Sequence, residues 1–182
     1  MYNEFLIREV IDQFITVYSK DGAPITILFD ADNTLYHYST YKRVEESKRE
    51  MYYKGFYHNL PVYPEAPVVV ENLQRFGLTV GILSATIDSP FCRPEKLASF
   101  AYHFPTISPD NIFLCEQGID KSTVVGDVRH TILVDDYHGN INQWYQAGGV
   151  AIKKSYSGKK RPVPVVTSLV DLFYVLHTLN VI

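Results

Sequence analysis

Cysteine is scarce in this chain of 182 residues, in which Cys92 and Cys115 are the only two. They lie far apart, and neither belongs to a Cys-x-x-Cys or Cys/His pattern of the kind that binds zinc. The six histidines likewise show no spacing typical of metal ligation. The sequence therefore predicts two plain thiols and no zinc centre.

Long apolar runs and a strong net charge are also missing. No stretch approaches the length of a membrane span, so no membrane partner is expected. A net charge of -3 and a pI near 6.0 argue against a stable complex with nucleic acid, which normally requires a basic face. The N-terminal residues lack the basic start and apolar core of a signal peptide, so cytoplasmic residence is the default expectation.

The chain does contain short apolar runs that alternate with segments of helical spacing. The runs are ITILFD, LTVGILS, NIFLCE, TILVDD and GGVAI. This alternation predicts a parallel sheet of βα units, and right-handed crossovers favour a doubly wound, Rossmann-like α/β fold. Ligands of such sheets bind at the carboxyl ends of the strands.

Three segments of different character divide the sequence. Residues 1–24 hold apolar positions at helical spacing and predict a leading helix. Residues 25–35 and 64–182 form the predicted α/β core, and residues 36–63 form a small helical cap inserted over the site. A homodimer is left open.

Local signals mark the ends of two core helices and one loop. Pro64 suits a first helical turn, and Gly77 suits the C-terminal cap of the same helix. Ser168 and Asp171 predict a capping box at the start of the final helix. The segment KKSYSGKKRP, which begins at Lys153, is interpreted as a solvated loop first and as an anion-attracting rim second.

Reactive side chains follow three of the predicted strands. They are Asp30 with Asp32, Ser84, and Asp135 with Asp136. Aspartates that converge in this way repel one another, and a hard divalent cation with oxygen ligands relieves the repulsion. Mg²⁺ commonly binds one or two carboxylates together with phosphate oxygens, so the sequence predicts a magnesium and phosphate site.

These residues carry a resemblance to a known superfamily. ILFDADNTLY resembles the first motif of the haloacid dehalogenase superfamily, an apolar strand followed by D-x-D-x-T, and VGILSAT resembles the second. GIDKSTVVGDV and ILVDDYHGNI are similar to the third and fourth motifs, in the family order. The resemblance covers about residues 25 to 155 and implies a magnesium-dependent phosphatase.

The resemblance also implies a role for each motif residue. Asp30 is the expected nucleophile, which forms an aspartyl-phosphate. Asp32 is expected to protonate the leaving oxygen and then to activate water, for which it must be held protonated by burial or by the charge of Asp30. Magnesium is expected to bind the carboxylates of Asp30 and Asp135 and the backbone carbonyl of Asp32.

The remaining motif residues are expected to bind the phosphate or to support the metal. Ser84, Ala85 and Lys121 are the expected phosphate contacts, because phosphoryl transfer requires neutralisation of the equatorial oxygens. Lys96 is a rival for the role of Lys121. Asp136 is expected to orient Lys121 or a metal-bound water.

A narrower resemblance concerns the substrate. YYKGFYHNLPVYPEA is similar to a stretch in the 5'(3')-deoxyribonucleotidases of the superfamily, although this chain has Asn33-Thr34 where that group has Gly-Val. The substrate implied is a (deoxy)nucleoside monophosphate, with Tyr53 and Phe56 contacting the base; alternatively, the tyrosine-rich segment is only the core of the cap. Other small phosphate esters, nucleic-acid 3' ends and a catalytically silent nucleotide-binding module are the competing functions.

Overall fold

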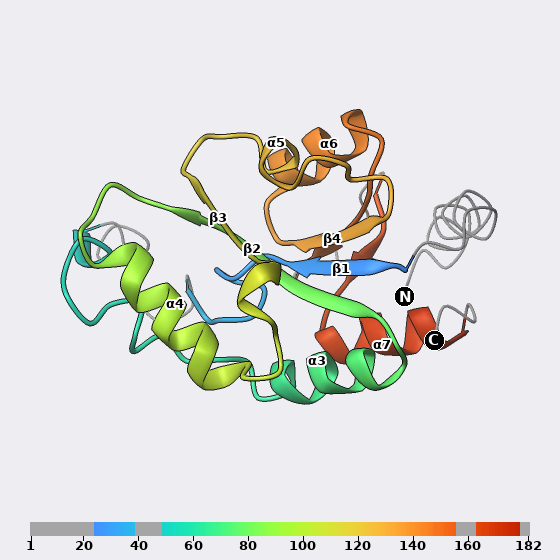
Figure 1. Cartoon of the computed structure of the whole chain (residues 1–182), viewed down its shortest axis with the longest axis horizontal. Coiled ribbons are helices and arrows are strands. Elements are labelled where there is room, and N and C mark those ends of the chain that lie inside the picture. Colours follow the sequence, from blue (N-terminus) through green and yellow to red (C-terminus); the bar gives the residue numbers. More distant parts are fainter. Residues whose placement is uncertain (1–23, 39–48, 156–162, 179–182) are drawn as a thin grey trace.

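A computed structural model describes residues 24–38, 49–155 and 163–178 (Figure 1). The predicted leading helix, the middle of the predicted cap and most of the basic KKSYSGKKRP segment lie outside these residues. The described strands form one parallel sheet in the order β3-β2-β1-β4-β5-β6. This confirms the doubly wound α/β fold. Among the described helices, none is long and apolar enough to cross a membrane.

The elements follow one another along the chain as βα units. The strands are β1 (Thr26–Phe29), β2 (Thr79–Thr86), β3 (Ile112–Glu116), β4 (Thr131–Asp135), β5 (Val150–Lys154) and β6 (Val165–Val166). The helices are α3 (Ala66–Arg75), α4 (Cys92–His103), α5 (Ser122–Val125), α6 (His138–Gln146) and α7 (Leu169–Thr178), with a 3₁₀ turn, η1 (Pro109–Asn111), before β3.

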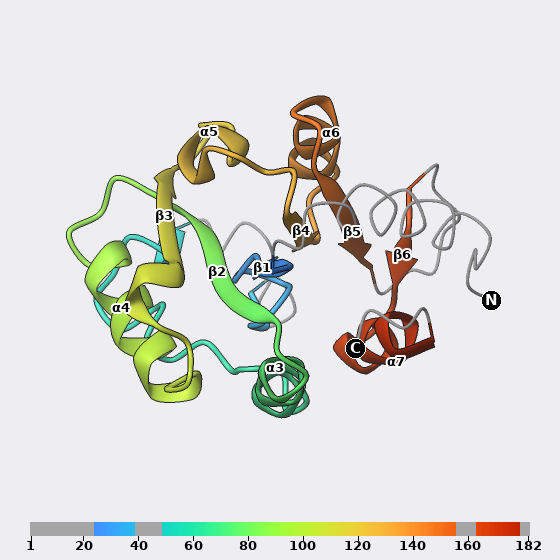
Figure 2. The same ribbon diagram turned by 45° about the vertical axis from the view of Figure 1, so that its right-hand side comes forward.

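Helices cover both faces of the sheet, as Figure 2 shows, with α3, α4 and α7 on one side and α5 and α6 on the other. Alternate residues of β1 supply the two cores. Ile27 and Phe29 pack in the cluster that includes α3, α4 and α7, whereas Leu28 packs with Ile141 and Trp144 of α6. The three apolar residues of this strand are therefore all buried, on one face or the other, as is usual in parallel sheets.

The order of the strands places a topological switch beside β1. The chain passes from β1 outward through β2 and β3, then returns to the other side of β1 and continues outward through β4, β5 and β6. In an open α/β sheet the crevice at such a switch is the usual ligand site. The carboxyl ends of β1 and β4 therefore define the expected position of the site.

Two of the predicted helix ends are confirmed by their hydrogen bonds. Gly77 has a φ of 86°, and its N–H and that of Leu78 donate to the carbonyls of Gln74 and Leu73, which is a Schellman motif. The Asp171 N–H donates to Ser168 Oγ at 3.2 Å, and the Ser168 N–H donates to an Asp171 oxygen at 2.9 Å. This is the reciprocal pattern of a capping box.

Other expectations need correction. Helix α3 begins at Ala66, two residues after Pro64, and β2 continues past Ser84 to Thr86. Lys153 and Lys154 were assigned to a solvated loop, but they end β5 and are buried. The described parts of the insertion, residues 36–38 and 49–63, are mostly turns, with helix only at residues 49–50.

A glycine in the sheet provides a test of the packing. Gly81 pairs with Leu28, and a Cβ at this position would lie 2.4 Å from the Asn111 carbonyl oxygen. We expect Gly81→Ala to lower the free energy of unfolding by about 1–3 kcal/mol, although alanine normally suits a strand better than glycine. Chemical denaturation measures this, with Thr79→Ala as a control in the same strand. An unchanged or raised stability of Gly81→Ala would contradict the described packing.

Candidate active site

The central pair of carboxylates is fixed by the register of two strands. Phe29 of β1 pairs with Val134 of β4, so the next residues, Asp30 and Asp135, stand side by side at the switch point. The Asp30 N–H donates to the Val134 carbonyl at 2.9 Å. Both side chains are buried. The sheet itself therefore brings together Asp30 and Asp135, whose carboxylates were both predicted to bind magnesium.

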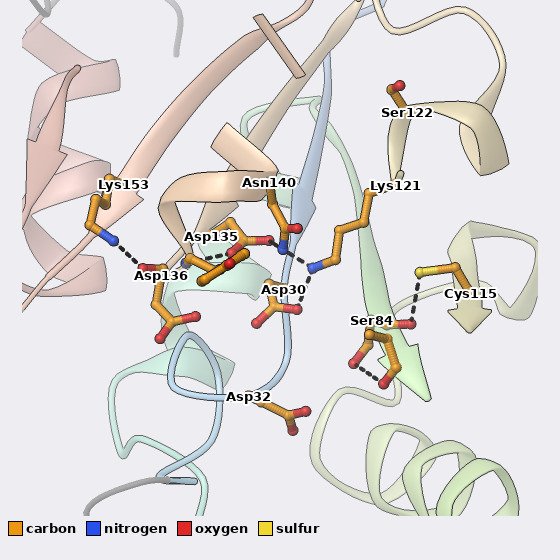
Figure 3. Close-up of polar contacts among 12 residues, drawn as sticks. Asp30, Asp32, Ser84, Cys115, Lys121, Ser122, Asp135, Asp136, Asn140 and Lys153 are labelled. Carbon is orange, nitrogen blue, oxygen red and sulfur yellow. Dashed lines mark hydrogen bonds and ion pairs between the residues drawn. The ribbon is translucent and has the colours of Figure 1, made fainter. Parts of the chain in front are cut away.

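Lys121 joins these two carboxylates, as Figure 3 shows. Its Nζ donates to Asp30 Oδ1 at 2.5 Å and to Asp135 Oδ2 at 2.7 Å. Lys121 directly precedes α5 and is 2% exposed, so this ammonium is withdrawn from solvent. A buried charge of this kind persists only when it is paired, and here it has two anionic partners.

Asp135 is held by three donors. Besides Lys121, Asn140 Nδ2 donates to Asp135 Oδ2 at 2.8 Å, and the Tyr137 N–H donates to Asp135 Oδ1 at 2.7 Å. The carboxylate has about four acceptor positions, so one position on Oδ1 remains. This fixed carboxylate can therefore still bind a cation.

Asp136 completes a group of three carboxylates. One oxygen from each of Asp30, Asp135 and Asp136 lies within 4.8 Å of the others. Oxygen donors at this mutual distance fit a hard cation such as Mg²⁺. The structure thus brings Asp136 into the group of carboxylates that could hold a metal ion, whereas the sequence predicted only a supporting role for it.

Burial and mutual repulsion change the acidity of these groups. Burial raises the pKa of Asp30 well above its usual value, and Asp135, Asp32 and Asp136 raise it further, against the opposing effect of Lys121. Burial and Asp135 raise the pKa of Asp136 to about 6. For Lys121, burial lowers the pKa but the two aspartates outweigh it, so the pKa is raised. An added cation would favour ionised carboxylates.

The loop after β1 carries Asp32 into the cavity. Asn33 has a φ of 62°, a left-handed conformation that asparagine adopts more readily than most residues. The N–H groups of Leu35 and Tyr36 both donate to the Ala31 carbonyl at 2.9 Å, which closes the turn. Asparagine therefore suits the left-handed position that this loop requires.

A second lysine, Lys96 of α4, binds the other aspartate. Its Nζ donates to Asp32 Oδ2 at 2.7 Å, to Ser84 Oγ at 2.8 Å and to the Ala85 carbonyl at 2.8 Å. Lys96 and Ser84 are both buried. The two lysines that the sequence offered as rivals therefore both contact predicted site residues. Lys121 pairs with Asp30 and Asp135, whereas Lys96 pairs with Asp32.

A cavity of about 620 Å³ opens above these groups. Asp30, Asp32, Lys121, Asp135 and Asp136 line it, together with Ala85 and residues of the loops after β3 and β4. The described part of the insertion contributes Tyr38, Met51 and Tyr57.

Tyr53 and Phe56, the predicted base contacts, lie elsewhere. They line a separate depression of about 310 Å³ on the insertion. Phe56 packs edge-on against Tyr38 and Tyr57, with ring centroids 5.6 and 5.0 Å apart. For Phe56 this arrangement favours the alternative in which the ring belongs to the core of the cap, whereas Tyr53 is 65% exposed.

Glu95 attaches the insertion to the core. Its carboxylate accepts the N–H of Gly55 at 2.5 Å, of Tyr57 at 3.1 Å and of His58 at 3.4 Å. The Tyr57 ring lies 4.9 Å from Lys96 Nζ, which follows Glu95 in α4. Helix α4 therefore positions Tyr57, which lines the cavity, through Glu95, and it also carries Lys96, which binds Asp32.

Lys153 and Lys154, at the end of β5, support the two loops that carry aspartates. Lys153 Nζ donates to the Asp136 carbonyl, and Lys154 Nζ donates to the Thr34 carbonyl at 2.9 Å. Lys154 Nζ also lies 3.2 Å from the centre of the Tyr63 ring. The sequence placed these lysines in solvent because their neighbours, KKSYSGKKRP, are polar; their burial depends on tertiary contacts.

The comparisons place this fold among known structures. Neither the models of known protein families nor the curated protein sequences give a match. Among solved structures, a haloacid dehalogenase-like hydrolase from Xanthomonas campestris is 13% identical with a TM-score of 0.63, covering 88% of this chain and 94% of its own. A putative β-phosphoglucomutase from Bacteroides vulgatus is 12% identical with a TM-score of 0.64, covering 98% of both chains.

A third structure is a D,D-heptose 1,7-bisphosphate phosphatase from B. bronchiseptica complexed with magnesium and phosphate. It is 12% identical with a TM-score of 0.59, covering 87% of this chain and 99% of its own. Other similar structures are dehalogenases. The chain therefore has the α/β fold of the haloacid dehalogenase-like hydrolases, while identities this low leave the reaction and substrate to be argued from the site.

Lys154 leads to a prediction about pH. Burial lowers its pKa to about 8, against a value of about 10.4 in an unfolded chain. Between these values the unfolded state binds more protons, so this group makes stability rise with pH. We expect the stability of the wild type relative to Lys154→Met to increase by about 1–3 kcal/mol from pH 8 to pH 10. Denaturant titrations at each pH measure this.

The exposed Lys54 supplies the control for this experiment. Lys54→Met should show a constant difference from the wild type over the same pH range. Parallel stability curves for the wild type and Lys154→Met would contradict the described burial of the Lys154 ammonium.

Proposed function

We propose that this protein is a magnesium-dependent phosphatase that hydrolyses a small phosphate monoester through an aspartyl-phosphate on Asp30. The observation that carries the proposal is the arrangement at the switch point, where Lys121 joins Asp30 to Asp135 and Asp136 completes the group of carboxylates. The fold supports it, because the similar structures include a phosphatase complexed with magnesium and phosphate.

Asp30 is the group that attacks phosphorus. Lys121 binds its Oδ1, so Oδ2 is the oxygen that forms the new bond to phosphorus while the bond to the leaving oxygen breaks. Water then attacks the aspartyl-phosphate, which releases inorganic phosphate and restores the carboxylate. Asp30, Asp135 and Asp136, with the Asp32 carbonyl, would hold Mg²⁺, which would supply positive charge that favours ionised Asp30 and offsets the charge of the phosphate.

Asp32 transfers the proton in both steps. It donates a proton to the leaving oxygen and later takes one from the attacking water. Lys96 donates to Asp32 Oδ2 in the structure, so Oδ1 is the oxygen that is left to carry the proton. A phosphate dianion in the cavity beside Asp32 would offer Lys96 a second anionic partner.

The presence of Asp32 also favours an ester over a halide as the leaving group. A halide departs as a stable anion and needs no proton, whereas an alkoxide needs one. The carboxyl group of Asp32 lines the same cavity as Asp30, which suits the ester. The same pair argues against a silent binding module, which has no chemical need for both aspartates.

The finer proposal is a nucleoside monophosphate as the substrate. It is supported by the similarity of YYKGFYHNLPVYPEA to the 5'(3')-deoxyribonucleotidases. The cavity is large enough for a ligand of this size. Other small phosphate esters remain the alternative.

The reaction is tested with a panel of esters. We expect phosphate release from at least one of the common nucleoside monophosphates, sugar phosphates or an aryl phosphate when Mg²⁺ is present. Chelation should abolish the release, and added Mg²⁺ should restore it, because the clustered carboxylates and the phosphate are all anionic. Full turnover after exhaustive chelation would contradict the magnesium assignment, and the absence of hydrolysis across the panel would contradict the phosphatase itself.

The nucleophile is tested by substitution. Asp30→Asn keeps the size of the side chain but removes the attacking carboxylate, so we expect kcat to fall by at least about 10³-fold. Asp110→Asn is the matched control, because Asp110 is exposed in the 3₁₀ turn before β3. Circular dichroism should show that both variants are folded. A rate for Asp30→Asn within a few fold of the wild type would rule out Asp30 as the nucleophile.

A further inference from the structure

Two exposed apolar side chains stand at the mouth of the site cavity. Among the described residues, several large apolar side chains are exposed, but Tyr137 and Ile119 are the ones that also line this cavity. Tyr137 follows β4, and Ile119 lies in the loop after β3. Single exposed apolar residues are common on protein surfaces, so their position in the cavity is what requires explanation.

The backbone of Tyr137 is fixed beside the carboxylates. Its N–H donates to Asp135 Oδ1 at 2.7 Å, and its carbonyl accepts the Ile141 N–H at 3.3 Å in the first turn of α6. Tyr137 as a whole nevertheless remains 66% exposed. A side chain with a fixed backbone and an exposed ring is prepared to contact a ligand without a large loss of backbone freedom.

The Tyr137 ring occupies the space that a side chain at position 139 would fill. A Cβ at Gly139 would lie 2.4 Å from Tyr137 Cε1 and 3.1 Å from both Cδ1 and Cζ. Alanine is a better helix former than glycine, yet it would displace the ring at this position in α6. The absence of a side chain at Gly139 thus allows the Tyr137 ring to pack closely over the start of the helix.

A polar side chain of α6 lines the same cavity as this ring. Gln143 also lines the cavity, one helical turn after Gly139 and therefore on the same face of α6. Its amide can both donate and accept a hydrogen bond. A flat ring with a neighbouring amide suits a planar heteroaromatic group better than a sugar or an alkyl chain.

We propose that Tyr137, supported by Gly139, is a specificity-determining residue that stacks on a planar heteroaromatic leaving group of the substrate. This inference rests on the proposed phosphatase function and assigns the stacking surface to the loop after β4 instead of to Tyr53 and Phe56. Tyr137 thus favours those small phosphate esters whose leaving group carries a base-like ring.

Binding to an inactive variant tests the proposal separately from the reaction. In the Asp30→Asn background with Mg²⁺, the dissociation constants of adenosine 5'-monophosphate and ribose 5-phosphate are measured by calorimetry. The ratio of the two dissociation constants reports the contribution of the adenine base, because any change in phosphate binding affects both ligands alike. We expect Tyr137→Ala to lower the preference for the nucleotide by about 5- to 150-fold and Tyr137→Phe to preserve it.

Gly139→Ala provides a second variant that leaves Tyr137 in place. It should reduce the same preference, because the new methyl group displaces the ring, and it should have little further effect when Tyr137 is already alanine. Tyr102→Ala is the control, because Tyr102 is 79% exposed on α4 and lies outside the residues that line the cavity.

The outcomes separate the two proposals. An equal loss of affinity for both ligands, or an unchanged ratio in folded Tyr137→Ala, overturns the stacking role and leaves the phosphatase proposal intact. A failure of the unmodified protein to hydrolyse any ester overturns the phosphatase proposal, while the binding ratio still decides whether Tyr137 contacts the base.

Discussion

The ion pair of Lys121 with Asp30 and Asp135 is the interaction on which the rest of the site depends. The pairing of β1 with β4 places two buried carboxylates side by side, which is costly unless a cation lies between them. Lys121 supplies that cation from the start of α5. The same interaction binds one oxygen of Asp30 and leaves the other directed away from the lysine, where phosphorus can be attacked (Figure 3).

Charge balance explains why an added cation fits. Asp30, Asp32, Asp135 and Asp136 all line the cavity. Among the described lysines near them, Lys121 and Lys96 pair with carboxylates, whereas Lys153 and Lys154 donate to backbone carbonyls. Burial is the first cause of the raised pKa values of Asp30 and Asp136, and the neighbouring carboxylates raise both further, although Lys121 opposes the shift of Asp30 and Lys153 opposes that of Asp136. A divalent cation would stabilise the ionised carboxylates and would offset the negative charge of a phosphate dianion.

The sequence was sufficient for the parts of the site that the sheet determines. Apolar runs that end in Asp30 and Asp135 predict buried strands, and a doubly wound topology brings their carboxyl ends together. The capping signals at Gly77 and Ser168 were also sufficient, because they act through neighbouring residues. Such features depend on local chemistry and on a few general rules of topology.

Features that depend on distant contacts could not be predicted in this way. The burial of Lys154 depends on Thr34 and Tyr63, which are far from it in the sequence. The aromatic residues of the insertion suggested a base contact, but Phe56 packs against its own neighbours. Tyr137 gave no sequence signal beyond its place after the aspartate pair; the glycine two residues later was the only available clue, and its meaning depends on the position of the ring.

The central claim is a covalent bond between Asp30 and phosphorus, and trapping that bond tests it most directly. The wild-type protein is mixed with a substrate ester and Mg²⁺, quenched in acid during turnover, digested and analysed by mass spectrometry. The account predicts a phosphoryl group on the peptide that contains Asp30, removed by hydroxylamine as an acyl phosphate is. Turnover with no such adduct, or with the phosphoryl group on another residue, would contradict it.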